Sequence, residues 1–253
     1  MPTMNVKFLV GRTAYNIRDW FLARSWLPLI NYVPFDRCWP YDVARYAGRR
    51  NFATIVDVGA NVGQTARYLR GFFRTATIHC FEPIPLTFQE LKRRTANDAN
   101  IQAHPVALSN QSGSINMIAS DFSETSAVTN LEGDFVSKVI AQTLDEFAMG
   151  NGISQIDLLK IDVEGHELAV LEGARKLLST GKVQAIYIEF GTDSTDIQHT
   201  HLSKIHSALE PYGFVFSGIY EAYRLQPRYR MWFGNALYWN ARFLQSEAEN
   251  AAT

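Results

Sequence analysis

The chain has 253 residues, of which 47% are hydrophobic and 19% are charged, and its formal net charge is -1. These values are typical of a globular protein with a substantial core, and they argue against nucleic acid as a partner. The sequence shows neither an apolar run of the ~20 residues that a membrane span requires nor a secretory signal peptide. Its two cysteines, Cys38 and Cys80, are too few for a disulfide framework or a metal site. We therefore expect a soluble, cytoplasmic protein.

The N-terminal residues 1–50 contain a strongly apolar patch, from Trp20 to Ile30, that is interrupted by Arg24. We expect this segment to form a helical cap that packs on the main domain, residues 51–253, or on a second subunit. An interfacial helix on a membrane is the alternative, but the charges do not gather on one face as such a helix requires. A membrane contact through this segment and a homodimer both stay open.

A β-branched run from Thr54 to Val58 predicts a buried strand, which leads through a turn with glycines at Gly59 and Gly63 into a helix. Such a junction leaves backbone N–H groups and a helix N-terminus facing an open crevice. Glu82 ends the second predicted strand, where an acid can hold a ribose diol. Together these features predict a nucleoside-binding crevice.

The sequence of the turn also indicates which nucleoside-containing cofactor the crevice binds. Asn61 stands where the dinucleotide-binding pattern G-x-G-x-x-G has its middle glycine, which lets the backbone approach a pyrophosphate. Its absence disfavours NAD and FAD, whereas S-adenosylmethionine, a nucleoside without phosphates, tolerates the side chain. A dinucleotide-dependent oxidoreductase remains the competing class, and a non-catalytic cofactor-binding scaffold is a third interpretation.

Strands and helices alternate along the rest of the chain. Helices are expected over residues 64–74, around Phe88 and Leu91, after residue 167, and in a segment that ends at residue 213. The later strands are expected over residues 101–108, 114–119, 156–162, 183–190, 214–219 and 231–239, with a polar loop over 120–135. This alternation predicts an α/β protein with a mostly parallel sheet covered on both faces, and the last two strands predict an antiparallel hairpin.

Acidic side chains lie at or near the ends of four predicted strands: Asp57, Glu82, Asp162 and Glu189. The carboxyl ends of parallel strands meet at one edge of the sheet, so we expect these groups in one crevice. Asp162 and Glu189 are candidate catalytic bases, the second because a neighbouring aromatic ring can shield it from water and raise its pKa. His166 is the third candidate, because imidazole changes its charge near neutral pH.

Four further residues are candidates for substrate contacts. Lys160 and Glu164 flank Asp162, and they either face the substrate or form an ion pair that fixes the junction between strand and helix. Thr125 and Ser126 lie in the polar loop, and loops at this edge of such a sheet commonly contact the substrate.

Two histidines, His199 and His201, lie in a polar segment before the last predicted helix. A protein metal site usually takes three or four ligands, and no convincing third ligand lies near this pair in the sequence. We therefore expect no metal ion.

A series of motifs resembles the FkbM family of S-adenosylmethionine-dependent methyltransferases. The motifs occur in family order over roughly residues 52–191, and the block around Lys160 is specific. They are Asp57-Val58-Gly59-Ala60-Asn61-Val62-Gly63, Phe81-Glu82-Pro83, Val106-Ala107-Leu108-Ser109-Asn110 with Gly113, Thr143-Leu144-Asp145, Leu159-Lys160-Ile161-Asp162-Val163-Glu164-Gly165-His166-Glu167, Leu171-Glu172-Gly173-Ala174 and Ile188-Glu189-Phe190.

The resemblance implies a Rossmann-like, seven-stranded methyltransferase sheet, mostly parallel with a reversed terminal strand. It also implies O-methylation of a small-molecule or glycan hydroxyl in natural-product or polysaccharide biosynthesis, with S-adenosylmethionine as cofactor. The predicted cofactor site contains Asp57, Gly59, Asn61, Gly63, Glu82, Leu108 and Asn110.

Overall fold

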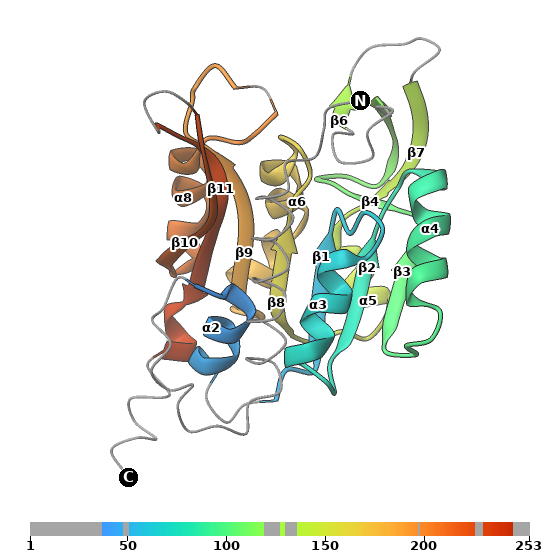
Figure 1. The fold of residues 1–253 in the computed structure, drawn as a ribbon, viewed down its shortest axis with the longest axis horizontal. Coiled ribbons are helices and arrows are strands. Elements are labelled where there is room, and N and C mark those ends of the chain that lie inside the picture. The colour runs from blue at the N-terminus through green and yellow to red at the C-terminus, as the bar shows by residue number, and fades with distance from the viewer. Residues whose placement is uncertain are drawn as a thin grey trace, which may run out of the picture.

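In the computed structural model, the described residues are 37–47, 51–118, 127–129, 136–196, 198–225 and 230–244. They form a seven-stranded sheet of order β10-β11-β9-β8-β1-β2-β3 and a four-stranded sheet of order β4-β7-β5-β6 (Figure 1). The apolar patch from Trp20 to Ile30 and the candidate substrate residues Thr125 and Ser126 lie outside the described residues. Among the described residues, no helix is both long and apolar enough to cross a membrane.

The bounds of the elements follow the expected alternation of strands and helices. The strands of the large sheet are β1 (Thr54–Val58), β2 (Thr77–Phe81), β3 (Ile101–His104), β8 (Ile156–Ile161), β9 (Val183–Gly191), β10 (Phe214–Leu225) and β11 (Arg230–Asn240). The strands of the small sheet are β4 (Ala107–Leu108), β5 (Gly113–Ile118), β6 (Ala127–Thr129) and β7 (Val136–Gln142). The helices are α2 (Trp39–Tyr46), α3 (Gln64–Phe72), α4 (Pro85–Thr95), α5 (Leu144–Gly150), α6 (Glu167–Gly173), α7 (Arg175–Ser179), α8 (Leu202–Leu209) and the 3-10 helix η2 (Glu210–Tyr212).

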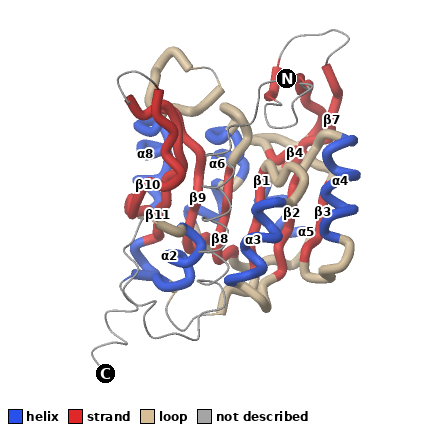
Figure 2. The backbone as a smooth tube through the Cα atoms, viewed as in Figure 1, coloured by secondary structure: helices blue, strands red, loops and turns tan. Residues whose placement is uncertain are grey.

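The large sheet has the predicted mostly parallel architecture. Strands β3, β2, β1, β8 and β9 pair in parallel, and β11 runs antiparallel to both β9 and β10. The reversed strand and the terminal hairpin are therefore confirmed. A parallel sheet must be covered on both faces, and Figure 2 shows helices on each side of it.

Alternate residues of the central strands face two separate cores. Ile55 of β1 and Leu158 of β8 pack in the core under α2, α3 and α4, whereas their neighbours Val56 and Leu159 pack in the core under α5 to α8. This alternation follows from the period of two along a strand. Because both faces are buried, most side chains of these strands are apolar and their register is strongly specified.

Helix α2 is the described part of the predicted N-terminal cap, and it packs on the sheet. Trp39 stacks on Tyr187 of β9 with ring centroids 3.9 Å apart, and the buried Asp42 accepts a hydrogen bond of 3.0 Å from the hydroxyl of Tyr220. These contacts join residues far apart in the sequence, so α2 is an integral part of this core.

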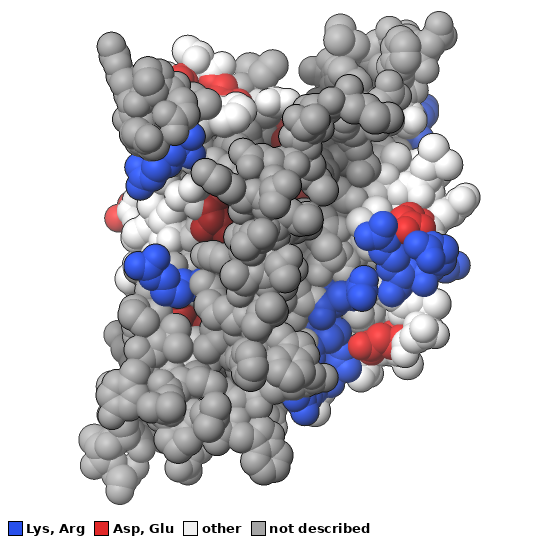
Figure 3. All heavy atoms as spheres, in the orientation of Figure 1, with Lys and Arg blue, Asp and Glu red and all other residues white. Residues whose placement is uncertain are grey.

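Basic side chains gather over α3 and α4 on the face shown in Figure 3, with acidic side chains among them. Arg70 lies 2.7 Å from Asp98 and also donates to the carbonyl groups of Phe73 and Ala76, so it ties the end of α3 to the start of β2. Exposed ion pairs on α4 contribute only about 0–1 kcal/mol each. Arg70 and the ion pairs on α4 therefore connect surface elements.

The region between residues 101 and 150 differs from its prediction. The single strand expected over 101–108 is two strands, because β3 joins the large sheet while β4 pairs with β7 in the small one. Pro105 lies between them, and proline lacks the N–H group that a continuing strand would donate. Strand β7 and helix α5 were not predicted, and the single helix expected after residue 167 is divided into α6 and α7.

Two neighbouring histidines, His79 in β2 and His104 at the end of β3, make the free energy of unfolding depend on pH. His79 Nδ1 lies 3.2 Å from His104 Nε2, and both rings pack against aromatic side chains. Burial and the neighbouring His79 lower the pKa of His104 to about 4. The unfolded chain, with an ordinary histidine pKa, therefore binds protons more tightly, and the free energy of unfolding falls as the pH drops from about 6.5 toward 4.

We expect the His104→Gln variant to lose less stability than the wild type between about pH 7.5 and pH 5. The difference should be about 1 kcal/mol, which corresponds to roughly 2–4 °C in melting temperature for a chain of this size. Thermal melts at the two pH values measure it, with His206→Gln as the control because His206 is exposed on α8. Parallel pH profiles for wild type and His104→Gln would contradict the assignment.

Candidate active site

The turn after β1 is built so that the chain passes directly against the end of β8. The N–H groups of Gly59 and Ala60 donate to the carbonyl of Phe81 over 3.1 and 3.0 Å. Gly59 has a φ of +74°, and a Cβ atom there would lie 1.8 Å from the carbonyl oxygen of Asp162. Asn61 also has a positive φ, of 48°, which asparagine tolerates better than most residues. The turn therefore packs so closely on the end of β8 that residue 59 has no room for a side chain.

Glu82 holds this turn from the neighbouring strand. Its two carboxylate oxygens accept hydrogen bonds from the N–H groups of Asn61, at 3.1 Å, and Ile84, at 2.9 Å. Burial raises the pKa of Glu82, and the two N–H groups oppose this rise. An ionised carboxylate offers about four acceptor sites, so about two remain for the hydroxyl groups of a ribose.

A buried lysine supports the turn from below. Lys160 Nζ lies 3.2 Å from Asp57 Oδ1 and 3.2 Å from Asp162 Oδ2, and it donates to the carbonyl of Gly59 over 3.2 Å. Asp57 and Lys160 are both buried. Burial lowers the pKa of Lys160, but the two carboxylates outweigh it and raise the pKa. The structure thus places Lys160 beneath the turn in an ion pair, which was the alternative to a substrate contact, and its partners are Asp57 and Asp162.

The acidic side chains of Asp162, Glu164 and Glu189 lie close together at the edge of the crevice where β8 and β9 end. The side chain of Asp162 is 38% exposed, whereas Glu189 is only 8% exposed. Burial, together with the carboxylates of Asp162, Glu164 and Glu167, raises the pKa of Glu189 to about 10. Glu189 therefore retains its proton at neutral pH in this environment, which makes Asp162 the better placed base of the two.

Glu167 fixes the loop between β8 and α6. Its Oε1 accepts hydrogen bonds from the N–H groups of Gly165 and Val163, and its Oε2 accepts one of 2.5 Å from the hydroxyl of Thr200. Within this loop Glu164 has a positive φ of 51°. The sequence predicted Glu167 near a helix N-terminus, where an acidic side chain is favourable, but it indicated no role for Thr200.

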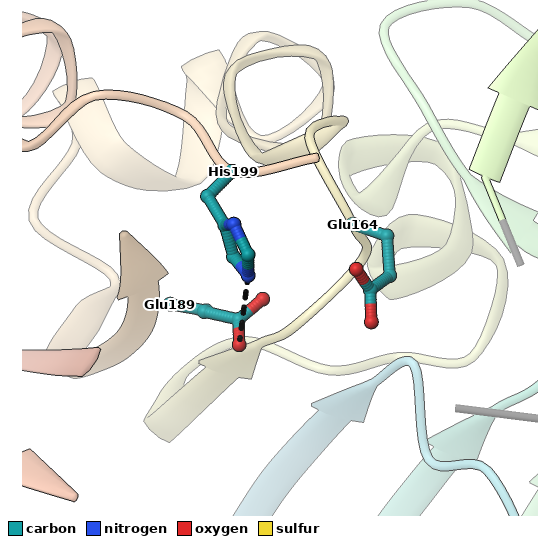
Figure 4. Close-up of side chains that lie close together, drawn as sticks. All are labelled: Glu164, Glu189 and His199. Carbon is teal, nitrogen blue, oxygen red and sulfur yellow. Dashed lines mark ion pairs between the residues drawn. The ribbon is translucent and has the colours of Figure 1, made fainter. Parts of the chain in front are cut away.

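The segment before α8 brings a histidine to the same edge. His199 Nδ1 lies 2.7 Å from Asp196 Oδ2, which also accepts a 3.0 Å hydrogen bond from Trp232 Nε1. The His199 ring stacks on Phe233 at 4.6 Å, and its Nε2 lies 3.9 Å from Glu189 Oε1. Figure 4 shows His199 and Glu189 side by side with Glu164 facing them.

The remaining candidates lie around the loop after β4. His166 Nε2 lies 2.9 Å from the hydroxyl of Ser109, and Asn110 donates to Glu172 over 3.1 Å. A Cβ atom on Gly173 would lie 2.0 Å from the carbonyl oxygen of Ser109, so α6 packs directly on this loop. Burial lowers the pKa of His166. His166 thus binds the loop after β4, whereas Asp162 and Glu189 adjoin each other at the ends of β8 and β9.

The fold and the site together define a class of protein. A seven-stranded sheet with a reversed strand between β9 and β10, a glycine cradle after β1 and an acid after β2 define a Rossmann-like methyltransferase. The chain belongs to the FkbM methyltransferase family: the family described as Methyltransferase FkbM domain matches residues 57–216. Methyltransferases of this family use S-adenosylmethionine, which is therefore the cofactor.

Several relatives of this chain are named methyltransferases. The chain is 30% identical over 172 residues to Methyltransferase sdnD of Sordaria araneosa, with 54% of this chain and 64% of the relative covered. It is 29% identical over 143 residues to Hexuronic acid methyltransferase AglP of Haloferax volcanii, with 56% and 58% covered. It is 26% identical over 153 residues to 2-O-methyltransferase NoeI of Sinorhizobium fredii, with 54% and 62% covered. The chain thus spans less than two thirds of the length of these relatives.

Solved structures to which this chain is similar include TrmK of M. capricolum in complex with S-adenosyl-homocysteine. It is 12% identical to this chain, with a TM-score of 0.47, and the match covers 82% of this chain and 69% of that one. The residues of this chain fit a nucleoside by their own geometry, because Glu82 accepts one hydrogen bond at each carboxylate oxygen and keeps acceptor sites free for ribose hydroxyl groups.

Proposed function

We propose that the protein is an S-adenosylmethionine-dependent O-methyltransferase that acts on a hydroxyl group of a sugar or another small molecule. The observation that carries this proposal is the carboxylate of Asp162, which is partly exposed at the crevice edge while Lys160 holds it at 3.2 Å. A hydroxyl group is a poor nucleophile until a base takes its proton, and a positioned carboxylate supplies such a base.

Each part of the site has one task in this proposal. The cofactor, when bound, supplies an activated methyl group on a positively charged sulfur. The turn from Gly59 to Gly63 and the carboxylate of Glu82 bind the nucleoside, and Asp162 accepts the proton of the acceptor hydroxyl. Holding two reactants in line contributes up to ~7–11 kcal/mol to lowering the barrier, whereas a general base adds typically ~10²–10⁴-fold in rate. Alignment therefore provides the larger share.

The charge of the crevice edge favours hydroxyl-rich acceptors. The carboxylates of Asp162 and Glu164 meet there beside the neutral carboxyl group of Glu189, and these two charges would repel the phosphates of a nucleic acid. The relatives named for a hexuronic acid and for 2-O-methylation support a sugar as the acceptor. Family membership removes the dinucleotide-dependent oxidoreductase as an alternative, and the non-catalytic scaffold remains to be tested by turnover.

We expect the Asp162→Asn variant to bind S-adenosylhomocysteine but to transfer methyl groups about 10²–10⁴-fold more slowly. Methylation of a panel of sugars and uronic acids is measured by mass spectrometry. Binding is measured as a thermal shift, which amounts to about 2.7 kcal/mol at one hundred times the dissociation constant. Glu210→Gln, an exposed acid on η2, is the matched control.

Three outcomes separate the interpretations of this experiment. Slow transfer with intact binding supports Asp162 as the base. Unchanged transfer by Asp162→Asn removes Asp162 from this role and leaves the alignment of the reactants as the source of catalysis. Binding of S-adenosylhomocysteine by the wild type without transfer to any acceptor of the panel supports the scaffold.

A further inference from the structure

We propose that Glu164, Glu189 and His199 bind a divalent metal ion at the edge of the crevice, where the ion holds the acceptor hydroxyl. The role of the ion in catalysis depends on the proposed O-methyl transfer, whereas the binding site itself does not. The sequence predicted no metal ion because His199 has only His201 as a near neighbour. In the structure His201 caps α8 instead, with Nδ1 accepting a hydrogen bond from the N–H group of Ser203.

The three side chains come from separate elements and converge on one point. Glu164 follows β8, Glu189 lies in β9, and His199 precedes α8. One potential ligand atom of each lies within 4.8 Å of those of the other two, and the three groups face a common space (Figure 4). Nitrogen and oxygen ligands lie about 2.0–2.2 Å from an ion such as zinc, so two ligands lie up to roughly 4.4 Å apart. Small side-chain movements therefore suffice to bind an ion.

The carboxyl group of Glu189 supports a ligand in the space between the three side chains. The residue is 8% exposed, and its Oε2 atom has no hydrogen-bond partner among the described residues. A buried acceptor without a partner is unfavourable, so such groups are rare unless they serve a ligand, and a bound cation would displace the proton that Glu189 otherwise retains. A cation in the space between Glu189, Glu164 and His199 would satisfy this oxygen.

His199 is held in the orientation that a metal ligand needs. With Nδ1–H donated to Asp196 at 2.7 Å, the lone pair of Nε2 is free to face Glu189. Asp196 is itself fixed by Trp232, and stacking on Phe233 sets the plane of the ring. A carboxylate behind the distal nitrogen is the usual support of a metal-binding histidine, since it fixes the tautomer and raises the basicity of the ligand.

Backbone features position His199 and Glu164. Gly191 lets His199 lie close to β9, since a Cβ atom there would approach the His199 Cβ atom to 2.9 Å. Glu164 has a positive φ, which is unfavourable for a residue with a side chain. The hydrogen bonds from Gly165 and Val163 to Glu167 hold the loop in this conformation.

Two carboxylates and one imidazole suit a divalent ion such as Mn²⁺ or Zn²⁺ and leave coordination positions open for a hydroxyl oxygen. The ion would lower the pKa of a hydroxyl bound to it. The O–H bond would then break with its electron pair left on the oxygen, and the proton would pass to the carboxylate of Asp162, two residues before Glu164. The oxygen would form a bond to the methyl carbon while the bond from that carbon to sulfur breaks. The ion would also offset the negative charge that otherwise disfavours a uronic acid in this crevice.

Mn²⁺ binding to the chelator-treated full chain tests the site directly. We expect electron paramagnetic resonance to detect one bound Mn²⁺ per chain. Glu189→Gln and His199→Gln should each weaken this binding by about 100-fold or more, and Asp196→Asn, which changes no ligand atom, by about 10–100-fold. Glu210→Gln and His206→Gln, an exposed acid and an exposed histidine, should bind Mn²⁺ as the wild type does.

Failure of the metal site and failure of the proposed function give different results. Absence of Mn²⁺ binding, or binding that Glu189→Gln and Asp196→Asn leave unchanged, would overturn the site. A thermal shift with S-adenosylhomocysteine, recorded on the same samples, reports on the cofactor crevice. Mn²⁺ binding that requires Glu189, found in a chain that transfers no methyl group, would support the site and overturn the proposed reaction.

Discussion

The Gly59→Ala variant is expected to lose about 2–5 kcal/mol of unfolding free energy, together with all measurable binding of S-adenosylhomocysteine. Gly59 has a φ of +74°, and a new Cβ atom would lie 1.8 Å from the carbonyl oxygen of Asp162 and 3.0 Å from its carbonyl carbon. A left-handed conformation costs an alanine about 1–2 kcal/mol, and forcing packed backbone apart adds about 1–3 kcal/mol. Neither backbone atom can rotate away as a flexible side chain would.

Gly213→Ala separates the two contributions. Gly213 has a similar φ of +79°, but nothing lies within 4 Å of the place where its Cβ atom would be. This control should lose only the conformational part, about 1–2 kcal/mol, and should bind S-adenosylhomocysteine normally. Urea unfolding and thermal shifts with the ligand measure both variants. Equal losses in the two variants would mean that the close approach of β1 to the end of β8 is absent in solution.

The parts of the fold that the sequence predicted are those with continuous burial. Strands β1, β8 and β9 are buried and mostly apolar on both faces, and a run of buried apolar residues rich in β-branched side chains predicts a strand. Strand β7 is different, because Val139 is buried while Ile140 next to it is 65% exposed. An apolar residue on the solvent side removes the alternation by which a half-buried strand is recognised. Strand β7 was missed for this reason.

Helix α5 did carry a signal. Thr143 accepts a hydrogen bond from the N–H group of Glu146 over 3.1 Å, which is the capping arrangement that a threonine and a glutamate three residues apart predict. The helix is only seven residues long, however, with too few apolar positions for a periodicity to emerge. A local cap without a periodic stripe is a weak sign of a helix.

The candidate site shows the same division between local and distant information. The positions of Gly59 and Asn61 in the turn and of Glu82 at the strand end could be predicted, because a turn and a strand end are local features. The contacts of His199 with Asp196 and Glu189 depend on how β9 and the segment before α8 pair, and no sequence pattern states this pairing. The buried position of Lys160 was foreseen only as an alternative, because one strand pattern fits both a ligand contact and an ion pair.

The Lys160→Met variant is expected to destabilise the protein by about 3–5 kcal/mol, since removal of one partner leaves a buried charge without compensation. Lys160 Nζ lies 3.2 Å from Asp57 Oδ1, and Asp57 has no exposed surface. Methionine retains most of the volume of the lysine stem, so little of the loss comes from packing. Urea unfolding at about pH 8 measures the change.

The double variant Asp57→Asn/Lys160→Met identifies the cause. It removes the buried charge together with its partner, so it should recover most of the stability that Lys160→Met loses. If the double variant is as unstable as the single one, the loss comes from the hydrogen bond of Lys160 to Gly59 and not from Asp57.

The pH dependence of Lys160→Met provides an independent check. Burial raises the pKa of Asp57 and Lys160 opposes this rise, so without Lys160 the folded pKa moves further above the unfolded value. The folded state then binds a proton more tightly than the unfolded state, and the variant gains stability relative to the wild type as the pH falls toward the ordinary pKa of an aspartate. The double variant should lack this gain. If it also retains the thermal shift with S-adenosylhomocysteine, Asp57 and Lys160 act on the cofactor only through the turn that they hold.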